Sequence, residues 1–363
     1  MKVLILTIKL GMGHFTAAKS LSQQIQTQFP NAEIDVLDIC EYIIPKFSST
    51  IYEYYNMFVN KGSKIYNMLY KHSEKNESDM KTLIPDHFLN KINDLIEDIQ
   101  PSVIISTCSI SSQLISAYKE NFNKEIPFIT CITDISFHPS WINPYTDYYL
   151  VATSSVKEGL MKRGINPNTI CVNGIPVKED FKQIRHDLHL ERDKHLLIMG
   201  GGLGMLPSKS SFYRELNEMK NVKTTIIVGK NEKLYEKING KYQNINVIGF
   251  TENVAAYVQE ATLIITKPGG ITVFECIVSE VPILLFEASL QQEVKNQKYI
   301  VDYGIGKILD SIDFTGEIYK LIHDDETLSK IRSNMRELKK EFNQSMFCKI
   351  LLSIHYSNQV INE

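Results

Sequence analysis

Short apolar runs, each bounded by glycine, proline or asparagine, alternate along most of the chain with longer segments that repeat at helical spacing. Ala17, Leu21 and Ile25, for example, recur every four residues and form one apolar stripe of a helix. Near-continuous apolar strands that alternate with helices are typical of parallel sheets covered on both faces. The pattern therefore predicts an α/β fold.

The predicted strands fall into two series. The first series comprises residues 3–7, 33–37, 103–106, 128–132, 148–151 and 170–172, and the second comprises 196–199, 224–228, 246–248, 263–266 and 282–286. The turn Asn173-Gly174-Ile175-Pro176 and the polar stretch 178–194 separate the two series. We expect two Rossmann-like domains, 1–176 and 177–340, followed by a helical tail, 341–363, that packs back on the first domain.

Length and composition fit two ordinary globular domains. The chain has 363 residues, of which 43% are hydrophobic and 22% charged, enough apolar side chain for two cores. A net charge of −3 gives no overall attraction to nucleic acid. The apolar N-terminus is too short for a signal peptide, and no apolar run approaches the ~18 residues of a spanning helix. We expect a cytoplasmic protein with no nucleic-acid partner.

The six cysteines are scattered, with no Cys-x-x-Cys and no short His/Cys spacing. This distribution argues against a zinc site and against a disulfide framework. Several cysteines lie inside apolar runs, where a free thiol behaves as a small core residue. Nothing in the sequence indicates a bound metal.

The first of three glycine-rich turns is Gly11-Met12-Gly13-His14, directly after the first predicted strand. His14 would stand at a helix start above the carboxyl edge of the sheet, where α/β proteins bind ligands. No third glycine completes a dinucleotide fingerprint, and no Gly-Lys-Ser/Thr completes a P-loop. An imidazole in this place suits a general base or a hydrogen-bond donor to phosphate, the alternative being a simple helix cap.

Two further glycine-rich turns follow strands of the second series. Gly200-Gly201-Gly202-Leu203-Gly204 offers backbone N–H groups that suit a diphosphate, the alternative being a flexible loop. Lys267-Pro268-Gly269-Gly270 ends a strand and begins a helix, the geometry that holds phosphate. Glu275 follows on that otherwise apolar helix, where burial requires hydrogen bonds that a ribose diol can supply. The turns together predict a nucleotide-sugar site.

Segment 42–88 departs from the regular alternation, because it interleaves aromatic residues with lysines. One interpretation is a pair of helices that pack through their aromatic side chains. The other is a surface that meets an apolar acceptor or a membrane interface, where amphipathic rings and lysines are favoured.

Seven short segments carry a resemblance that spans most of the chain. They are Gly11 to His14 with Ala17-Ala18; Thr133-Asp134-Ile135 through His138-Pro139-Ser140-Trp141; Gly174-Ile175-Pro176-Val177; Met199 to Met205; Gly249-Phe250-Thr251; Thr266 to Glu275; and Gln292-Glu293 with Asn296. On these the chain resembles the glycosyltransferases that include plant monogalactosyldiacylglycerol synthase, bacterial processive diacylglycerol glucosyltransferases and, more distantly, MurG. Each segment is weak alone, whereas the ordered set is specific.

The resemblance implies a GT-B fold, in which two Rossmann-like domains face each other across a cleft. It implies an inverting transferase that takes a hexose, glucose or galactose, from a UDP-sugar and requires neither cofactor nor metal. Phe250 and Thr251 would border the uracil, Glu275 would hold the ribose, and Gln292 and Glu293 would contact the hexose. The other implied donor contacts are Gly13, Gly202, Gly204, Gly269, Gly270, Ile271 and Thr272.

The same resemblance implies roles on the acceptor side. His14 would deprotonate the acceptor hydroxyl or steady the leaving phosphate, and Asp134 is the second candidate for the base. His138, Trp141 and Tyr66 would contact the acceptor, which would be diacylglycerol or a glycolipid at the inner face of the cell membrane.

Several alternatives stay open. Residues 288–291 lack the proline and glycine that many relatives place before the Gln-Glu pair, so the sugar is undecided. A soluble natural product is an alternative acceptor, and a UDP-N-acetylglucosamine epimerase is an alternative enzyme of the same architecture. The sequence leaves the oligomeric state undecided.

Overall fold

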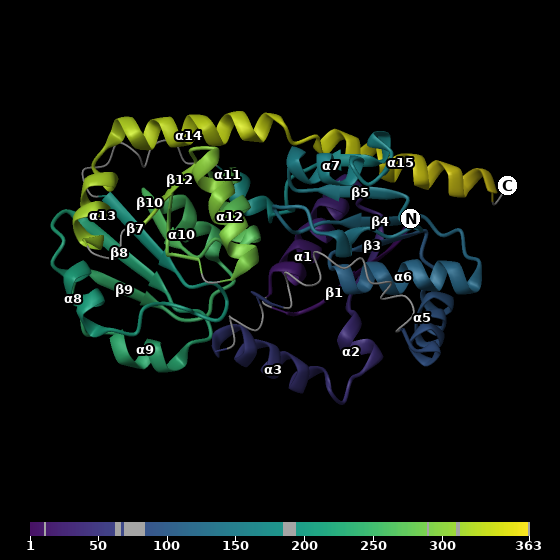
Figure 1. The fold of residues 1–363 in the computed structure, drawn as a ribbon, viewed down its shortest axis with the longest axis horizontal. Coiled ribbons are helices and arrows are strands. Elements are labelled where there is room, and N and C mark those ends of the chain that lie inside the picture. The colour runs from purple at the N-terminus through teal and green to yellow at the C-terminus, as the bar shows by residue number, and fades with distance from the viewer. Residues whose placement is uncertain are drawn as a thin grey trace. The chain divides into compact units, whose positions relative to one another are not determined.

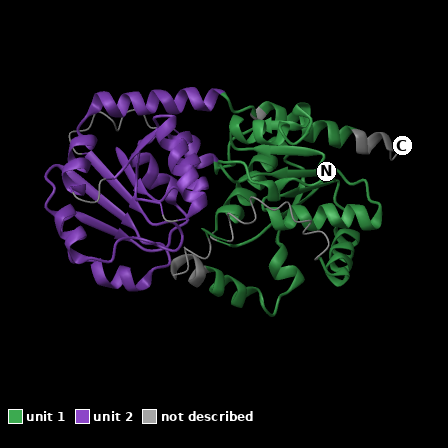
Figure 2. Cartoon of the chain, viewed as in Figure 1, with its two compact units in different colours: residues 1–178, 341–363 green, residues 179–340 purple. Residues whose placement is uncertain are grey.

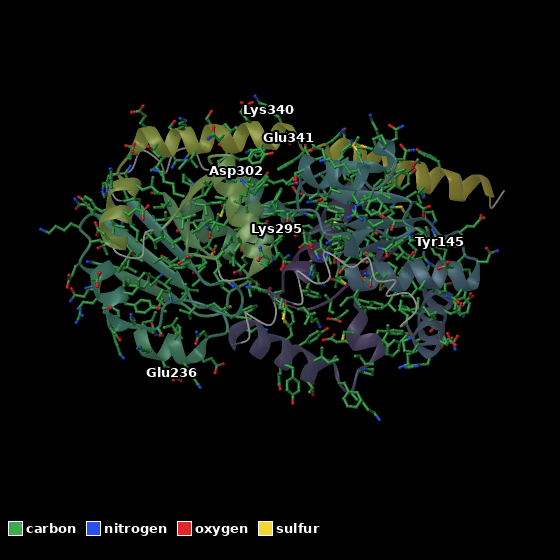
Figure 3. All side chains as sticks on the ribbon, in the orientation of Figure 1. Tyr145, Glu236, Lys295, Asp302, Lys340 and Glu341 are labelled. Carbon is green, nitrogen blue, oxygen red and sulfur yellow. The ribbon has the colours of Figure 1, made fainter. Side chains whose placement is uncertain are left out.

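The computed structural model describes residues 1–10, 12–61, 67–68, 84–183, 194–288, 290–309 and 313–361. They form two compact units: unit 1 comprises Met1–Lys178 with Glu341–Glu363, and unit 2 comprises Glu179–Lys340 (Figure 2). Lys340 and Glu341, labelled in Figure 3, mark the point at which the chain returns from unit 2 to unit 1.

Unit 1 is built on a six-stranded parallel sheet in the order β2-β1-β3-β4-β5-β6 (Figure 1). The strands are β1 (Lys2–Thr7), β2 (Glu33–Asp38), β3 (Val103–Ser106), β4 (Phe128–Cys131), β5 (Tyr148–Val151) and β6 (Ile170–Val172). Strands β3 and β4 are buried at every position, which is why both read as continuous apolar runs in the sequence.

Helices cover both faces of this sheet. The helices of unit 1 are α1 (Gly13–Gln28), α2 (Ile39–Ile43), α3 (Ser48–Lys61), α5 (Asp86–Ile99), α6 (Ser109–Phe122), α7 (Ser154–Met161) and α15 (Gln344–Ile361), with short 3-10 helices η2 (Pro139–Trp141) and η3 (Pro167–Thr169).

Alternate residues of β1 face different helices, because successive side chains of a strand point to opposite faces. Val3 and Ile5 pack in one core with residues of α1 and α15. Leu4 and Leu6 pack in another core with residues of α2, α5 and α6. The C-terminal helix therefore contributes to the core of unit 1.

Unit 2 has its own six-stranded parallel sheet, in the order β12-β11-β10-β7-β8-β9. The strands are β7 (Lys194–Met199), β8 (Val222–Ile227), β9 (Ile245–Ile248), β10 (Leu263–Thr266), β11 (Ile283–Leu285) and β12 (Gly306–Ile308). The helices are α8 (Ser210–Asn217), α9 (Glu232–Ile238), α10 (Val254–Glu260), α11 (Gly270–Ser279), α12 (Gln291–Asp302), α13 (Phe314–Ile322) and α14 (Asp325–Lys340), preceded by the 3-10 helix η4 (Glu179–Lys182).

The α/β class and both parallel sheets are confirmed, and every predicted strand is present within a few residues of its expected bounds. Strand β12 was missed. It has three residues, two of them exposed, and Lys307 occupies its centre. A short edge strand of this kind carries no apolar run, and only its pairing with β11 defines it.

Both interpretations of segment 42–88 find support among its described residues. Tyr42 and Phe88 pack against the core beneath α2 and α5, as helices packed through aromatic side chains would. Phe47 and Tyr54 are instead well exposed. Tyr66 lies outside the described residues. Among the residues that are described, no helix is long and apolar enough to cross a membrane.

Candidate active site

The strand order of unit 1 reverses at β1, which lies between β2 and β3. Helix α1, after β1, packs in one core, and α6, after β3, packs in the other. The loops after β1 and β3 therefore leave the sheet toward opposite faces. In α/β sheets the crevice between two such loops, at the carboxyl ends of the strands, is the usual ligand site.

His14 lies in this crevice, in the first turn of α1. Its Nδ1 lies 2.9 Å from the carbonyl oxygen of Thr107, which directly follows β3, and 2.7 Å from Oγ1 of Thr133. A carbonyl oxygen can only accept, so Nδ1 carries the proton and donates it. Nε2 is then the nitrogen with the available lone pair, as a general base requires.

Burial lowers the pKa of His14 below its ordinary value of 6.5, although the negative charge of Asp134 and the hydrogen bond to Thr107 act in the opposite direction. Desolvation disfavours the charged imidazolium. The ring is therefore neutral at neutral pH.

Asp134 and Trp141 stand beside this histidine. The indole Nε1 of Trp141 donates to Oδ2 of Asp134 over 2.6 Å, and both residues are buried. The indole and imidazole ring centroids are 6.3 Å apart. The structure thus brings three predicted residues of unit 1 together, with the Asp134 carboxylate held by Trp141. His138 is buried nearby in sequence, and its Nδ1 accepts from the backbone N–H of Ser140 over 3.2 Å.

In unit 2 the strand order reverses at β7, which lies between β10 and β8. The second glycine-rich turn follows β7 and the third follows β10, so the two turns flank the corresponding crevice. The predicted donor contacts in this unit, from Gly202 to Glu293, lie in loops or helix starts that follow the strands, except Glu275, which lies in the middle of α11. Gly13 is the exception, because it is the first residue of α1 in unit 1.

The second glycine-rich turn is folded against its neighbours. Gly204 has φ +62°, and a Cβ at this position would collide with the carbonyl oxygen of Val228. The N–H of Gly204 donates to the carbonyl oxygen of Gly201 over 2.9 Å. The Nδ2 of Asn231 donates to the carbonyl oxygen of Gly204, also over 2.9 Å. Gly204 therefore has a structural reason to be glycine, independent of any ligand.

The third turn is built differently. Gly269 has φ −72°, and a Cβ there would meet nothing within 4 Å. As the N-cap of α11, Gly269 has no side chain to cap the N–H groups of residues 270–272. The buried Glu275 follows on the same helix. Neither backbone conformation nor space within the protein requires glycine at position 269, which leaves room for a ligand near the helix start.

Lys267 joins this turn to two other elements. Its Nζ forms an ion pair with Oε1 of Glu293, in the first turn of α12, over 2.8 Å, and lies 3.3 Å from the sulfur of Met205. The Nδ2 of Asn296, also on α12, donates to the carbonyl oxygen of Pro268 over 2.8 Å. The buried Oδ1 of Asn296 has no hydrogen-bond partner among the described residues. The Lys267–Glu293 pair brings the predicted phosphate and hexose regions into contact.

The loop after β9 carries Phe250 and Thr251. The Phe250 ring is 55% exposed, and Nζ of Lys230 lies 5.6 Å from its centroid. The backbone N–H of Lys230 donates to the carbonyl oxygen of Gly202 over 3.1 Å. Lys230 therefore connects the predicted uracil region with the second glycine-rich turn.

Sequence reasoning missed three partners in these regions. Thr107 fixes the proton of His14, although it lies 93 positions away in the sequence. Thr133 was part of the resemblance and was given no role. Asn296 belongs to the polar segment that was predicted to meet the hexose hydroxyls, but its hydrogen bond to Pro268 was not predicted. The position of Thr107 at the end of a predicted strand was the available signal, since residues after parallel strands gather at one edge. Within the described residues, no group of three or more His, Cys, Asp or Glu could hold a metal ion.

Comparison with known families divides the chain at the same place as the fold. The model for "Monogalactosyldiacylglycerol (MGDG) synthase" matches residues 14–177, and the model for "Glycosyltransferase family 28 C-terminal domain" matches 195–350. Together the two matches span most of both units. The chain belongs to this family of glycosyltransferases. The family resemblance stated from the sequence is thereby confirmed.

Individual relatives of the glycosyltransferase agree with this assignment. This chain is 29% identical over 374 residues to a processive diacylglycerol beta-glucosyltransferase of Staphylococcus aureus (strain Newman), and the match covers 97% of this chain and 93% of the relative. Among solved structures, MurG of Acinetobacter baumannii matches with a TM-score of 0.61 and 13% identity over 93% of this chain and 94% of MurG.

A UDP-N-acetylglucosamine 2-epimerase also matches this glycosyltransferase, with a TM-score of 0.60 and 14% identity over 98% of this chain and 96% of the epimerase. At such identities a structural match shows the fold alone, here the GT-B fold predicted from the sequence. Because an epimerase shares that fold, the fold does not separate the two activities. The matches to the two family models separate them, because both models describe glycosyltransferases.

Proposed function

We propose that this glycosyltransferase moves a hexose, glucose or galactose, from a UDP-sugar to diacylglycerol or a glycolipid, with inversion at the anomeric carbon. The observation that carries the proposal is the 2.9 Å contact of His14 Nδ1 with the carbonyl oxygen of Thr107, because an imidazole that donates there has Nε2 available as a base. The names of the curated relative and of the N-terminal family favour a diacylglycerol acceptor.

In the proposed reaction the acceptor hydroxyl oxygen attacks the anomeric carbon of the hexose while its proton passes to Nε2 of His14. The bond between that carbon and the diphosphate oxygen breaks, and UDP leaves with the electron pair. Attack opposite to the leaving group inverts the anomeric carbon. Asp134 stabilises the imidazolium that forms, because its charge raises the pKa of His14.

We assign the donor to the carboxyl edge of unit 2. The N–H groups at the start of α11 and the partial positive charge of that helix end would bind the diphosphate and meet the charge of the leaving group without a metal. Glu275 would accept from the ribose hydroxyls, and Phe250 with Thr251 would border the uracil. Gln292 and Glu293 would contact the hexose, with Lys267 holding the Glu293 carboxylate in place.

We assign contact with the lipid surface to helix α3. Phe47 and Tyr54 are each 64% exposed and Ile51 is 38% exposed. Phe47 directly precedes α3 and accepts the backbone N–H of Ile51 over 2.9 Å, so the spacing i, i+4 and i+7 places the three side chains on one side of the helix and its first cap. Aromatic and aliphatic side chains on one helical face favour insertion at a membrane interface. The protein would then work as a peripheral enzyme.

A donor and acceptor screen tests the proposed function. Purified protein is incubated with UDP-glucose, UDP-galactose or UDP-N-acetylglucosamine, with vesicles that contain or lack diacylglycerol. We expect UDP release that depends on diacylglycerol, a product heavier by one hexose, a β-anomeric linkage by NMR, and no loss of rate with EDTA. Absence of hexose transfer to diacylglycerol from all three donors would refute the proposal, and transfer only to a soluble hydroxyl compound would favour the soluble-acceptor alternative.

A further inference from the structure

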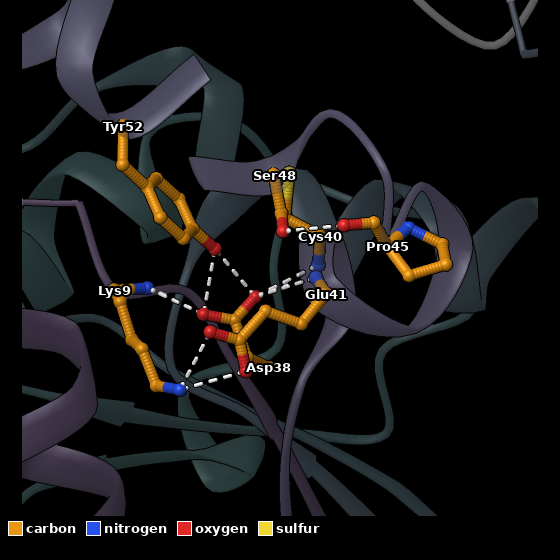
Figure 4. A network of polar contacts seen from close by, with 7 residues as sticks. All are labelled: Lys9, Asp38, Cys40, Glu41, Pro45, Ser48 and Tyr52. Carbon is orange, nitrogen blue, oxygen red and sulfur yellow. Dashed lines mark hydrogen bonds and ion pairs between the residues drawn. The ribbon is translucent and has the colours of Figure 1, made fainter. Parts of the chain in front are cut away.

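Three elements of unit 1 meet at the side chain of Asp38, the last residue of β2 (Figure 4). Its Oδ2 accepts the backbone N–H of Lys9, in the loop after β1, over 2.9 Å. Its Oδ1 accepts the N–H groups of Cys40 and Glu41, at the start of α2, over 2.9 and 3.1 Å. The phenol of Tyr52, on α3, donates to the carboxylate over 2.6 Å.

The Asp38 carboxylate is a buried junction, at which hydrogen bonds join these elements. It is 6% exposed, and a buried carboxylate is stable only when donors satisfy it, as four do here. Burial and the hydrogen bond to Asp38 raise the pKa of Tyr52 well above its usual range, so the phenol keeps its proton. Beside the junction, Nζ of Lys9 forms an ion pair with Glu41 over 2.7 Å, which fixes the loop after β1 a second time.

The junction joins two parts of the proposed reaction site. On one side, Lys9 lies in the loop between β1 and α1, the helix that carries His14, and its Nζ lies 5.4 Å from the ring centroid of Phe15, next to His14. On the other side, Tyr52 belongs to α3, and the exposed stripe consists of Ile51 and Tyr54 on that helix with Phe47 directly before it. At ~100° per residue, Tyr52 faces away from the centre of that stripe. Helix α3 is thus held through one side and exposes another.

We propose that Asp38 and Tyr52 are positioning residues, which fix the exposed stripe of α3 relative to the loop before His14, so that a lipid surface on the stripe presents its acceptor hydroxyl to the imidazole. The inference rests on the proposed transfer to a lipid acceptor. Neither residue touches the reacting atoms. Their effect is on the orientation of acceptors held in a bilayer, and an acceptor dissolved in water needs no such orientation.

Substitution Tyr52→Phe tests this inference, because it removes one hydrogen bond and keeps the ring. For long-chain diacylglycerol in phosphatidylglycerol vesicles, we expect KM to rise about fivefold through loss of acceptor orientation. For dihexanoylglycerol below its aggregation limit, kcat/KM should stay within about twofold of the unsubstituted protein. Vesicle co-sedimentation and UDP affinity should not change.

Tyr118→Phe is the matched control. It makes the same chemical change in unit 1, at a buried phenol oxygen that has no hydrogen-bond partner among the described residues. We expect KM and kcat/KM to stay unchanged for both the vesicle acceptor and the soluble acceptor. Equal losses with the vesicle and the soluble acceptor would reduce Tyr52 to a stabilising role and overturn the inference, as would no loss with either. Failure of the unsubstituted protein to glycosylate diacylglycerol in vesicles would refute the proposed function. The effect of Tyr52→Phe tests only the positioning role, so the two failures can be told apart.

Discussion

The carboxyl edges of the two sheets have the same topology and different chemistry. In unit 1 the edge brings together side chains joined by hydrogen bonds and a ring contact, namely His14, Thr133, Asp134 and Trp141. In unit 2 the edge consists of glycine-rich backbone, a helix start and the Lys267–Glu293 ion pair. The strand order reverses beside the first strand in both sheets. Under the proposed function, one topology would support a proton-accepting site in one unit and an anion-binding site in the other.

This difference shows what each kind of turn requires from its residues. A base needs its proton fixed by a neighbour, and His14 obtains this from the carbonyl oxygen of Thr107. A diphosphate site needs close approach of backbone N–H groups, which glycine permits. Substitutions in unit 1 should therefore change turnover, whereas substitutions in unit 2 should change donor affinity or folding.

His14→Ala should have the largest effect. Without the imidazole no side chain at this position takes the acceptor proton, and we expect kcat to fall by about 10² to 10⁴-fold. UDP affinity should be nearly unchanged, because the donor is assigned to unit 2. Steady-state UDP release and calorimetric titration with UDP measure the two quantities separately.

The pH dependence of the unsubstituted protein provides the control for His14. The base acts only when neutral, and its pKa is lowered by burial, so the rate should be flat through neutral pH and fall at acid pH, below the ordinary range of histidine. His14→Ala should lose this acid limb. If the limb persisted in the variant, or if UDP affinity fell together with kcat, the division between the two edges would be wrong.

Much of the fold could be predicted from the sequence, because buried parallel strands appear in it as continuous apolar runs. Strands β3 and β10 are apolar at nearly every position, and glycine or proline lies near their ends. Strand β12 has no such apolar run. The candidate site was predictable only in part. A histidine after a strand is visible in the sequence, but its tautomer depends on Thr107, and that contact exists only once β1 and β3 pair.

The glycines illustrate the same limit more sharply. Gly204 and Gly269 both looked like backbone that receives a phosphate. The structure gives Gly204 a left-handed conformation packed against Val228, and gives Gly269 an ordinary conformation in open space. Sequence cannot separate the two cases, because the deciding atom, the carbonyl oxygen of Val228, belongs to the end of another strand.

Gly204→Ala should give the next largest effect, on folding. A left-handed φ costs a side chain about 1–2 kcal/mol, and a collision with backbone adds about 1–3 kcal/mol, so unfolding free energy should fall by about 3 kcal/mol. Gly201→Ala is the matched control, since Gly201 has φ +69° and a Cβ there would meet nothing within 4 Å. It should lose only about 1 kcal/mol.

Urea unfolding monitored by circular dichroism measures both variants. The comparison of Gly204 with Gly201 isolates the contact with Val228, because the backbone cost is common to both. Equal losses of stability would mean that contact with Val228 does not hold the second glycine-rich turn in its conformation.

Gly269→Ala should have the smallest effect and the most selective one. The backbone at Gly269 suits any residue, and a Cβ would meet no protein atom within 4 Å, so unfolding free energy should change by less than about 0.5 kcal/mol. The added methyl group would stand where a diphosphate approaches the N–H groups at the start of α11, and we expect UDP affinity to fall about tenfold, or about 1.4 kcal/mol.

Calorimetric titration with UDP measures the affinity of the Gly269→Ala variant, and urea unfolding of the same preparation measures its stability. A variant that folds normally and binds UDP at full affinity would show that the diphosphate does not use this helix start, and the anion-binding character of the unit 2 edge would then rest on the second turn alone.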